Sequence, residues 1–240
     1  MPCLKPIGWR SASIEGDGMK LHGVAFSPFV QRVLFAARVK GVELDLAPIG
    51  GAALQSPVFA AISPMRRMPV LEEEDGWTLC ESSAIIAYLD ETQPGPSLLP
   101  ADRRMAARAR QIAGLVDTEI AAGLRHFVVQ KLFRMYANPG ALDYGRQQAE
   151  LGLDAIERIG LDGDGWAIGD APSIADAALI PFLTLGEMVC EVAPTPPTMA
   201  GRHSIDAYWK RIKTTPLGSR SYSEIRDGAA LAMQARNLAQ

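Results

Sequence analysis

The chain has 240 residues, 48% of them hydrophobic, and a formal net charge of −3 at pH 7. It is long enough to bury a core, its charge balance excludes the basic surface of a nucleic-acid binder, and no apolar run approaches the roughly 20 residues that span a membrane. The three cysteines, Cys3, Cys80 and Cys190, are widely separated and match no disulfide or metal-ligand spacing. This pattern favours a cytoplasmic protein without disulfide bonds.

The beginning of the chain lacks the pattern of a folded segment. Residues 1–18 mix proline, glycine, serine and charged side chains, without the continuous apolar run of a secretory signal. We therefore expect a flexible N-terminal extension in front of the patterned sequence that starts at Met19.

From Met19 to about Gln93 the hydrophobic period switches repeatedly, which is typical of alternating strands and helices. Proline and glycine separate the periodic segments. The predicted order is strand 20–26, helix 29–40 ended by Gly41, strand 42–46, a loop rich in glycine and alanine, a hairpin of strands 69–72 and 77–79, and helix 81–91. Residues 19–97 are therefore predicted to form an α/β domain.

Three prolines and a glycine between residues 92 and 100 indicate a linker, which we place at residues 98–102. Helical periodicity then predicts helices 101–136, 141–159 and 172–190. The second half of the first helix carries an apolar face made of Leu124, Phe127, Val128, Leu132, Met135 and Tyr136. Residues 103–240 are predicted to form an all-α helical bundle.

Four motifs lie within this pattern, at Ser27–Val33, Ser63–Leu71, Glu81–Asp90 and Pro172–Pro181. In this order and spacing they resemble the cytosolic glutathione S-transferase superfamily, over nearly all of residues 19–230. The resemblance implies a thioredoxin-like N-terminal domain, glutathione as co-substrate or cofactor, and a homodimer. It also implies an enzyme in which the thiolate of glutathione attacks a small hydrophobic electrophile.

Ser27 precedes Pro28 where the first predicted strand gives way to a helix. A serine followed by proline is a typical N-cap and first helical residue. In the family this position contacts the glutathione sulfur, so the resemblance implies Ser27 as the catalytic residue, with Arg32 matching an arginine of the family's helix. A serine hydroxyl can donate a hydrogen bond to the thiolate, and the positive end of the helix stabilises the same charge.

Met68 and Pro69 open the predicted hairpin, and a proline at the first residue of a strand is sterically allowed. The resemblance implies a cis peptide here, with the Met68 main chain pairing with the cysteinyl part of glutathione. Where the family usually has Asn-Pro-x-Gly-Lys, residues 63–67 read Ser-Pro-Met-Arg-Arg. Arg67 is predicted to replace the lysine as a ligand of a glutathione carboxylate, while contact through Arg66 or a solvated arginine pair are the alternatives.

Glu81 and Ser82 begin the last helix of the α/β domain. An acidic residue and a serine at a helix start are ordinary capping residues. The resemblance implies that Glu81 binds the ammonium of the γ-glutamyl end, and that Ser82 and the free N–H groups of the helix bind its carboxylate. Cys80, at the end of an apolar strand, is predicted to be a small packing residue rather than a nucleophile.

The acceptor is predicted to enter the site from the side of the helical domain. Phe29, Leu124, Phe127 and Val128 are predicted to line this pocket, although the same apolar stripe also fits plain core. Ser173 and Asp176 match a capping box, which is a structural role. The three histidines have no acidic residue at ligand spacing, so no metal site is predicted.

Other reactions fit the same resemblance. Zeta-type members isomerise maleylacetoacetate with glutathione as a cofactor, but their usual serine-cysteine run is Ser27-Pro28 here. Omega-type members have cysteine in place of Ser27, which disfavours thiol-disulfide reduction. Cleavage of aryl ethers or halides and a non-catalytic interaction role are further alternatives, and the Glu81-Ser82 pair argues against the last.

Overall fold

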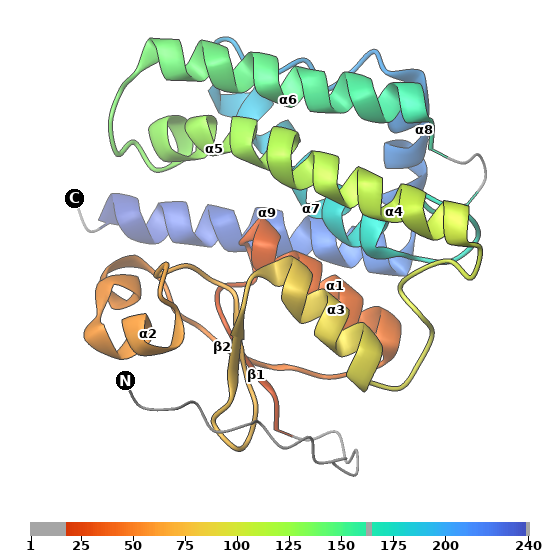
Figure 1. Cartoon of the computed structure of the whole chain (residues 1–240). Helices are drawn as coiled ribbons and strands as arrows, with labels where there is room; N and C mark the ends of the chain where they lie inside the picture. The colour runs from red at the N-terminus through yellow and green to blue at the C-terminus, as the bar shows by residue number, and fades with distance from the viewer. Residues whose placement is uncertain (1–17, 162–164, 239–240) are drawn as a thin grey trace, which may run out of the picture.

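The computed structural model describes residues 18–161 and 165–238. The predicted extension before Gly18, and with it Cys3, lies outside the described residues. The described chain forms a mixed sheet with flanking helices, followed by a layered set of helices (Figure 1). This confirms the predicted class, an α/β thioredoxin-like domain in front of an all-α one.

The sheet has four short strands in the order β2-β1-β3-β4. They are β1 (Lys20–His22), β2 (Asp45–Ala47), β3 (Val70–Glu72) and β4 (Thr78–Cys80). β1 pairs parallel with β2, because helix α1 (Pro28–Lys40) carries the chain back between them, and antiparallel with β3. β1 is shorter than the predicted strand 20–26, since the chain turns away after His22.

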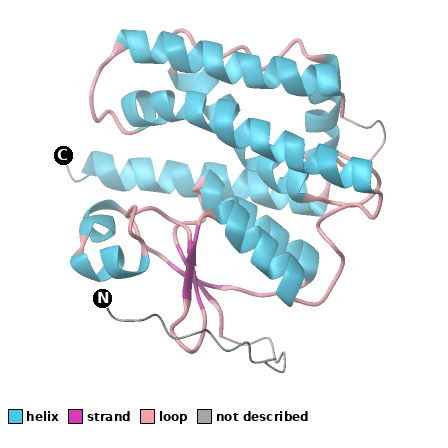
Figure 2. Cartoon of the chain, in the orientation of Figure 1, coloured by secondary structure: helices cyan, strands magenta, loops and turns pink. Residues whose placement is uncertain are grey.

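Helices cover both faces of this sheet. α1 and α3 (Ser82–Thr92) lie on the side of the helical domain, and α2 (Pro57–Ile62) lies on the other side (Figure 2). α2 and the short helix η1 (Gly51–Gln55) occupy the stretch that the sequence predicts as a loop. The local signal was present, because Ser56 caps α2 by accepting a hydrogen bond from the Phe59 N–H at 3.2 Å and Pro57 follows it.

The segment between Thr92 and the next helix, which includes the predicted linker 98–102, has no helix or strand. It is nevertheless fixed in place. Leu98 is fully buried, its N–H donates to the Asp90 carboxylate at 2.9 Å, and its carbonyl accepts from the Ile174 N–H at 3.0 Å. These contacts tie the α/β part to the helical part.

The helical part begins with one long helical rod. It consists of α4 (Arg103–Leu115), α5 (Ala122–Phe127) and two wider π-helical segments, η2 (Val116–Ala121) and η3 (Val128–Leu132). The predicted helix 101–136 is therefore correct as far as Leu132. Met135 and Tyr136 lie beyond its end and are exposed, so they do not belong to the apolar face.

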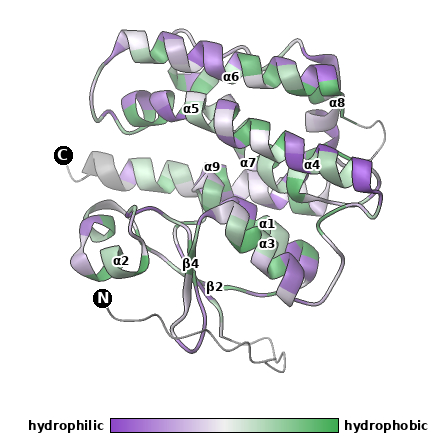
Figure 3. Cartoon of the chain, viewed as in Figure 1, coloured by the Kyte–Doolittle hydropathy of each residue, from purple (hydrophilic) through white to green (hydrophobic). Residues whose placement is uncertain are grey.

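The described part of the chain ends with four further helices: α6 (Pro139–Ile159), α7 (Ile174–Val192), α8 (His203–Ile212) and α9 (Pro216–Leu238). Hydropathy along α4 and α6 alternates between the two colours of Figure 3, as expected of helices with one face in the core. α7 is different, because almost every residue from Ala175 to Val189 is buried. It is the central helix on which the others pack.

The predicted capping box at the start of α7 is confirmed. Ser173 accepts a hydrogen bond from the Ala175 N–H, and the Asp176 carboxylate accepts from the Ser173 N–H at 2.9 Å. Asp176 also accepts from the Ala167 N–H at 2.8 Å and from the Tyr208 hydroxyl at 2.9 Å. One buried carboxylate therefore joins α7, α8 and the preceding loop.

Replacing Asp176 with alanine should lower the free energy of unfolding by about 2–4 kcal/mol at low pH, because it leaves several buried donors unpaired. Burial raises the pKa of Asp176 to about 6 from 3.8, although its hydrogen bonds act in the opposite direction. Asp176 has a higher pKa in the folded protein than in the unfolded chain. The stability that it contributes is therefore full below pH 3.8 and declines as the pH rises towards about 6. Urea denaturation of the wild type and of Asp176→Ala across this pH range measures the difference in the free energy of unfolding.

Asp206 in the first turn of α8 provides a control for that series. Its carboxylate accepts a hydrogen bond from the Gly201 N–H at the surface, so Asp206→Ala should change the stability by no more than about 0.5 kcal/mol. An Asp176→Ala penalty that grows with pH would contradict the assigned pKa direction.

Candidate active site

The register of the sheet brings three predicted site segments to one edge. His22 at the end of β1 pairs with Val70 at the start of β3, and Val70 pairs with Cys80 at the end of β4. The segments that continue from these ends are Gly23–Ser27, Met68-Pro69 and Glu81-Ser82. A Cβ built on Gly23 would meet the Val30 side chain at 2.5 Å and the Met68 Cβ at 3.6 Å, so these segments approach closely.

Ser27 occupies the N-cap position of α1, and Pro28 follows as the first helical residue. Its N–H donates to the Val24 carbonyl at 2.9 Å, which closes a tight turn, and its carbonyl accepts from the Gln31 N–H at 2.9 Å. The predicted cap is correct in position but not in bonding, because the Ser27 side chain makes no capping hydrogen bond. The hydroxyl, half-buried at the positive end of a helix, is therefore free for another acceptor.

The Met68-Pro69 peptide is cis, as the sequence resemblance implied. Pro69 is buried, and Met68 is half-buried beside Gly23. Among residues 18–161 and 165–238, none forms a hydrogen bond with the Met68 backbone. Its N–H and carbonyl can therefore pair with an extended ligand lying along this edge.

The two arginines before Met68 differ in their surroundings. Arg66, with a φ of 51°, directs its guanidinium to the Gln55 side chain at 3.3 Å. Arg67 has an exposed side chain, while its backbone is fixed by the buried Ser63, whose hydroxyl accepts from the Arg67 N–H at 3.0 Å and donates to its carbonyl at 2.8 Å. Ser63 thus holds the loop shape where the family usually has asparagine.

Glu81 has an unusual backbone, with φ 69° and ψ 112°, immediately before α3. A non-glycine residue at positive φ costs on the order of 1–3 kcal/mol, and such strain gathers at functional sites. Its exposed carboxylate forms no ion pair with any cation in the described part of the chain. Ser82 is the buried first residue of α3, where the backbone N–H groups have no helical partners. The Glu81 carboxylate therefore lies next to the N-terminus of α3, whose free N–H groups can bind an anion.

Cys80 precedes this pair and is not a competing nucleophile. Its thiol donates to the Ile62 carbonyl at 3.2 Å. Burial raises the pKa of the Cys80 thiol, a hydrogen bond with Ser63 lowers it, and the Glu81 charge raises it, so the net direction is upward. A raised pKa keeps the reactive thiolate scarce at neutral pH.

The predicted acceptor pocket is only partly supported by where its residues lie. Phe29 is 40% exposed and stacks edge-to-face on Phe182, with ring centroids 5.0 Å apart. Val128 is half-buried. Leu124 and Phe127 are fully buried in the core and line no surface, which corrects their assignment to the pocket. The helical spacing that suggested them fits their place in the main hydrophobic core.

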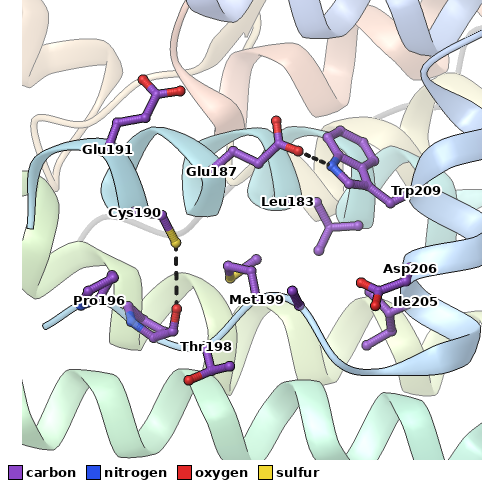
Figure 4. Close-up of a pocket in the computed structure, with 12 residues that line it drawn as sticks. Leu183, Glu187, Cys190, Glu191, Pro196, Thr198, Met199, Ile205, Asp206 and Trp209 are labelled. Carbon is purple, nitrogen blue, oxygen red and sulfur yellow. Dashed lines mark hydrogen bonds between the residues drawn. The ribbon is translucent and has the colours of Figure 1, made fainter.

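A large hollow of about 600 Å³ lies elsewhere, between α7, residues 196–200 and α8. Figure 4 shows its lining, which contains none of the predicted site residues. Its polar groups are already engaged, since Glu187 accepts from the Trp209 indole at 2.6 Å and from Lys213 at 2.9 Å, and Cys190 donates to the Pro197 carbonyl at 3.6 Å. We therefore keep the sheet edge as the candidate site.

Arg32 is buried one helical turn beyond Ser27. Its guanidinium forms an ion pair with Asp117 in η2, so it links α1 to the helical part. Sequence reasoning noted Arg32 but not this partner, because no local pattern connects residues 85 positions apart.

The described residues contain neither a metal-binding cluster nor a membrane-spanning helix. No group of three or more histidine, cysteine or acidic side chains there could hold a metal ion. Over the same part of the chain, none of the helices has the length and apolar character needed to cross a membrane.

Comparison with known proteins gives consistent matches. Residues 21–97 match the family model of the glutathione S-transferase N-terminal domain. The maleylacetoacetate isomerase of Pseudomonas aeruginosa is 33% identical over 175 residues, which cover 70% of this chain and 82% of that protein.

Two solved structures resemble most of the chain. The maleylacetoacetate isomerase from Methylobacterium extorquens AM1, with bound malonate and glutathione, superposes with a TM-score of 0.72 at 25% identity over 86% of this chain and 97% of that one. A glutathione S-transferase from Methylobacterium radiotolerans, in complex with glutathione sulfonate, gives a TM-score of 0.69 at 25% identity over 85% and 94% of the two chains.

Proposed function

The chain belongs to the glutathione S-transferase family, and from that premise we propose that it binds glutathione at the sheet edge and uses the glutathione thiolate on a small hydrophobic electrophile. One observation supports this most: the segments that carry Ser27, Met68 and Glu81-Ser82 leave the sheet at a single edge, and each carries polar groups for which the described residues provide no partner.

Each part of glutathione has a partner in this arrangement. The Met68 backbone pairs with the cysteinyl unit, the Glu81 carboxylate faces the ammonium, and Ser82 with the start of α3 holds the γ-glutamyl carboxylate. Arg67, whose backbone Ser63 fixes, reaches the other carboxylate. The unit that binds glutathione is residues 19–97. The acceptor side is formed by Phe29 of α1 together with Val128 of the helical domain, which begins at residue 103.

The Ser27 hydroxyl donates a hydrogen bond to the sulfur, and the N-terminus of α1 stabilises the same negative charge. The thiol proton leaves to solvent. The sulfur then forms a bond to the electrophilic carbon, and either a leaving group departs with the bonding electrons or a proton adds to the neighbouring carbon.

A second reaction is favoured by the relatives. Maleylacetoacetate isomerases from Pseudomonas aeruginosa and mouse are 33% and 30% identical to this chain. In an isomerase the thiolate adds to a cis double bond, the bond rotates and the thiolate leaves again. Glutathione is then regenerated, whereas a transferase consumes it.

A panel of electrophiles that includes maleylacetoacetate, each tested with and without glutathione, separates these reactions. We expect turnover that requires glutathione. Equal loss of glutathione and electrophile indicates transfer, and product formation without loss of glutathione indicates isomerisation. Turnover that is the same without glutathione, or absent from every compound, would contradict the proposal.

We also propose a homodimer. Large apolar side chains are exposed in the α/β part, where Met65, in the loop before β3, is 62% exposed and Trp77, in the turn between β3 and β4, is 42% exposed. Exposed residues of this kind favour association. Sedimentation equilibrium at micromolar concentration should give twice the chain mass of 25.8 kDa. A species of 25.8 kDa alone would contradict the dimer and leave the proposed glutathione site unaffected.

Cys80 and Cys190 are free thiols, which fits a reducing cytoplasmic location.

A further inference from the structure

The last helix of the chain contacts the turn that carries Ser27. α9 passes next to α1 at the junction of the two domains (Figure 1). At this point the Gln31 side-chain amide, which is fully buried, donates to the Glu224 carboxylate of α9 at 2.8 Å and to the Ala25 carbonyl at 2.7 Å. One amide group therefore connects α9 to the loop just before Ser27.

Glu224 is itself held firmly. It accepts hydrogen bonds from Arg38 at 2.6 and 2.8 Å and from Arg220 at 2.8 Å. Burial raises the pKa of the Glu224 carboxyl, but its hydrogen bonds to Arg220, Gln31 and Arg38 outweigh burial and leave the pKa lowered. Glu224 is therefore a carboxylate at neutral pH, and hydrogen bonds to a charged acceptor are the stronger kind.

A second contact from α9 reaches the same loop. Phe26, directly before Ser27, packs against a small cluster made of Ile225 and Ala229 of α9 and Met188 of α7. A Cβ on Gly228 would lie 2.9 Å from the Phe26 Cβ, so the absence of a side chain at Gly228 lets α9 approach this closely. Both residues that precede Ser27 are thus fixed by the end of the chain, Ala25 through Gln31 and Phe26 through packing.

The turn links these contacts to the Ser27 hydroxyl. The Ser27 N–H bonds to the Val24 carbonyl, so the direction of the Ser27 side chain depends on the shape of residues 24–27. The hydroxyl has no capping hydrogen bond of its own to fix it. Its orientation must therefore come from the backbone around it.

We propose that Gln31 and Glu224 are positioning residues, through which α9 sets the Val24–Ser27 turn and aims the Ser27 hydroxyl at the glutathione sulfur. This inference rests on the proposed function. Gln31 is fully buried and the Glu224 carboxylate is bonded to Gln31, Arg38 and Arg220, so neither is among the groups that we assign to glutathione. Their loss should therefore affect activation of the thiol and not the binding of the peptide. A displacement of about 1 Å at a reacting group can lower the rate by about a hundredfold.

The test compares three variants in the full-length protein. Gln31→Met keeps the side-chain length and removes the hydrogen bonds to Ala25 and Glu224, and with them a longer one that Gln31 accepts from Arg38 at 3.5 Å. The kcat should therefore fall by about tenfold to a hundredfold, with KM for glutathione near the wild-type value and a raised pKa for the bound thiol. Glu224→Gln keeps an acceptor for Gln31 and should retain more activity than Gln31→Met. Glu191→Gln is the matched control, because it removes another ion pair of α9, that with Arg226 at 2.9 Å, away from the turn.

The outcomes separate this inference from the proposed function. If the wild-type protein neither binds nor uses glutathione, the proposed function and the positioning role are both wrong. An active wild type with unchanged kcat and unchanged thiol pKa in Gln31→Met overturns the positioning role alone. An equal fall of kcat in all three variants, or a raised KM for glutathione with unchanged kcat, would show a merely structural role and would also overturn the positioning role. If Gln31→Met fails to fold, Glu224→Gln against Glu191→Gln decides by the same two measurements.

Discussion

Replacing Ser27 with alanine is expected to lower turnover by about ten- to a hundredfold while glutathione affinity stays close to that of the wild type. The hydroxyl contacts the sulfur alone, whereas the peptide is held by the Met68 backbone and by Glu81-Ser82. Loss of one hydrogen bond to an anion removes roughly 1.5–3 kcal/mol of thiolate stabilisation and raises the pKa of the bound thiol by about one to two units. Steady-state kinetics with calorimetric affinities measures both effects.

The pH dependence gives the sign of this effect. Because the variant's thiol has the higher pKa, its reactive fraction falls at neutral pH and recovers as the pH rises. Raising the pH should therefore restore part of the lost turnover. A folded Ser27→Ala protein with wild-type turnover and the wild-type pH profile would remove Ser27 from the chemistry, and another group, such as a tyrosine hydroxyl, would have to stabilise the thiolate.

Ser56 provides a matched control, because it is also an N-cap followed by proline. Unlike Ser27, it does accept a capping hydrogen bond, from Phe59. Ser56→Ala should thus cost about 1 kcal/mol of stability without a change in turnover. Ser27→Ala should instead lower turnover and change the stability by no more than about 0.5 kcal/mol. This differs from the expectation that the sequence alone supports, in which Ser27 is a bonded cap.

Replacing Glu81 with glutamine is expected to weaken glutathione binding by roughly 1–3 kcal/mol, because it removes the charge that faces the ammonium of the γ-glutamyl end. This corresponds to an increase in Kd of about 5- to 150-fold. Isothermal titration calorimetry measures it, and raising the salt concentration should narrow the gap between the two proteins, since this carboxylate is exposed.

Glu91, which is exposed near the other end of α3, is the control for that measurement. Glu91→Gln changes the net charge equally, so it should leave Kd unchanged. Equal affinities of the wild type and Glu81→Gln would place the γ-glutamyl end elsewhere, even if glutathione still binds.

Local signals predicted much of the fold. Gly41 ends α1 in the left-handed conformation, and the capping box of Ser173 and Asp176 begins α7, because both features depend on a few consecutive residues. The same reasoning passed over Ser56-Pro57 at the start of α2, where the glycine- and alanine-rich composition gave the weaker indication of a loop.

Features that depend on tertiary packing could not be predicted in this way. The apolar stripe of the long helix does not say whether a residue faces a pocket or the core, and Leu124 and Phe127 face the core. Gln31 and Glu224 are 193 positions apart, so no local pattern joins them. The segments with Ser27, Met68 and Glu81 were placed by family resemblance, and the strand register gives the physical reason why they meet.

The most direct test of the central claim, that this edge binds glutathione and activates its thiol, is a pH titration of bound glutathione by ultraviolet absorbance of the thiolate. The account predicts a thiol pKa in the wild-type complex at least one unit below the value of about 8.5 for a free thiol. A bound thiol that titrates like free glutathione would contradict the account.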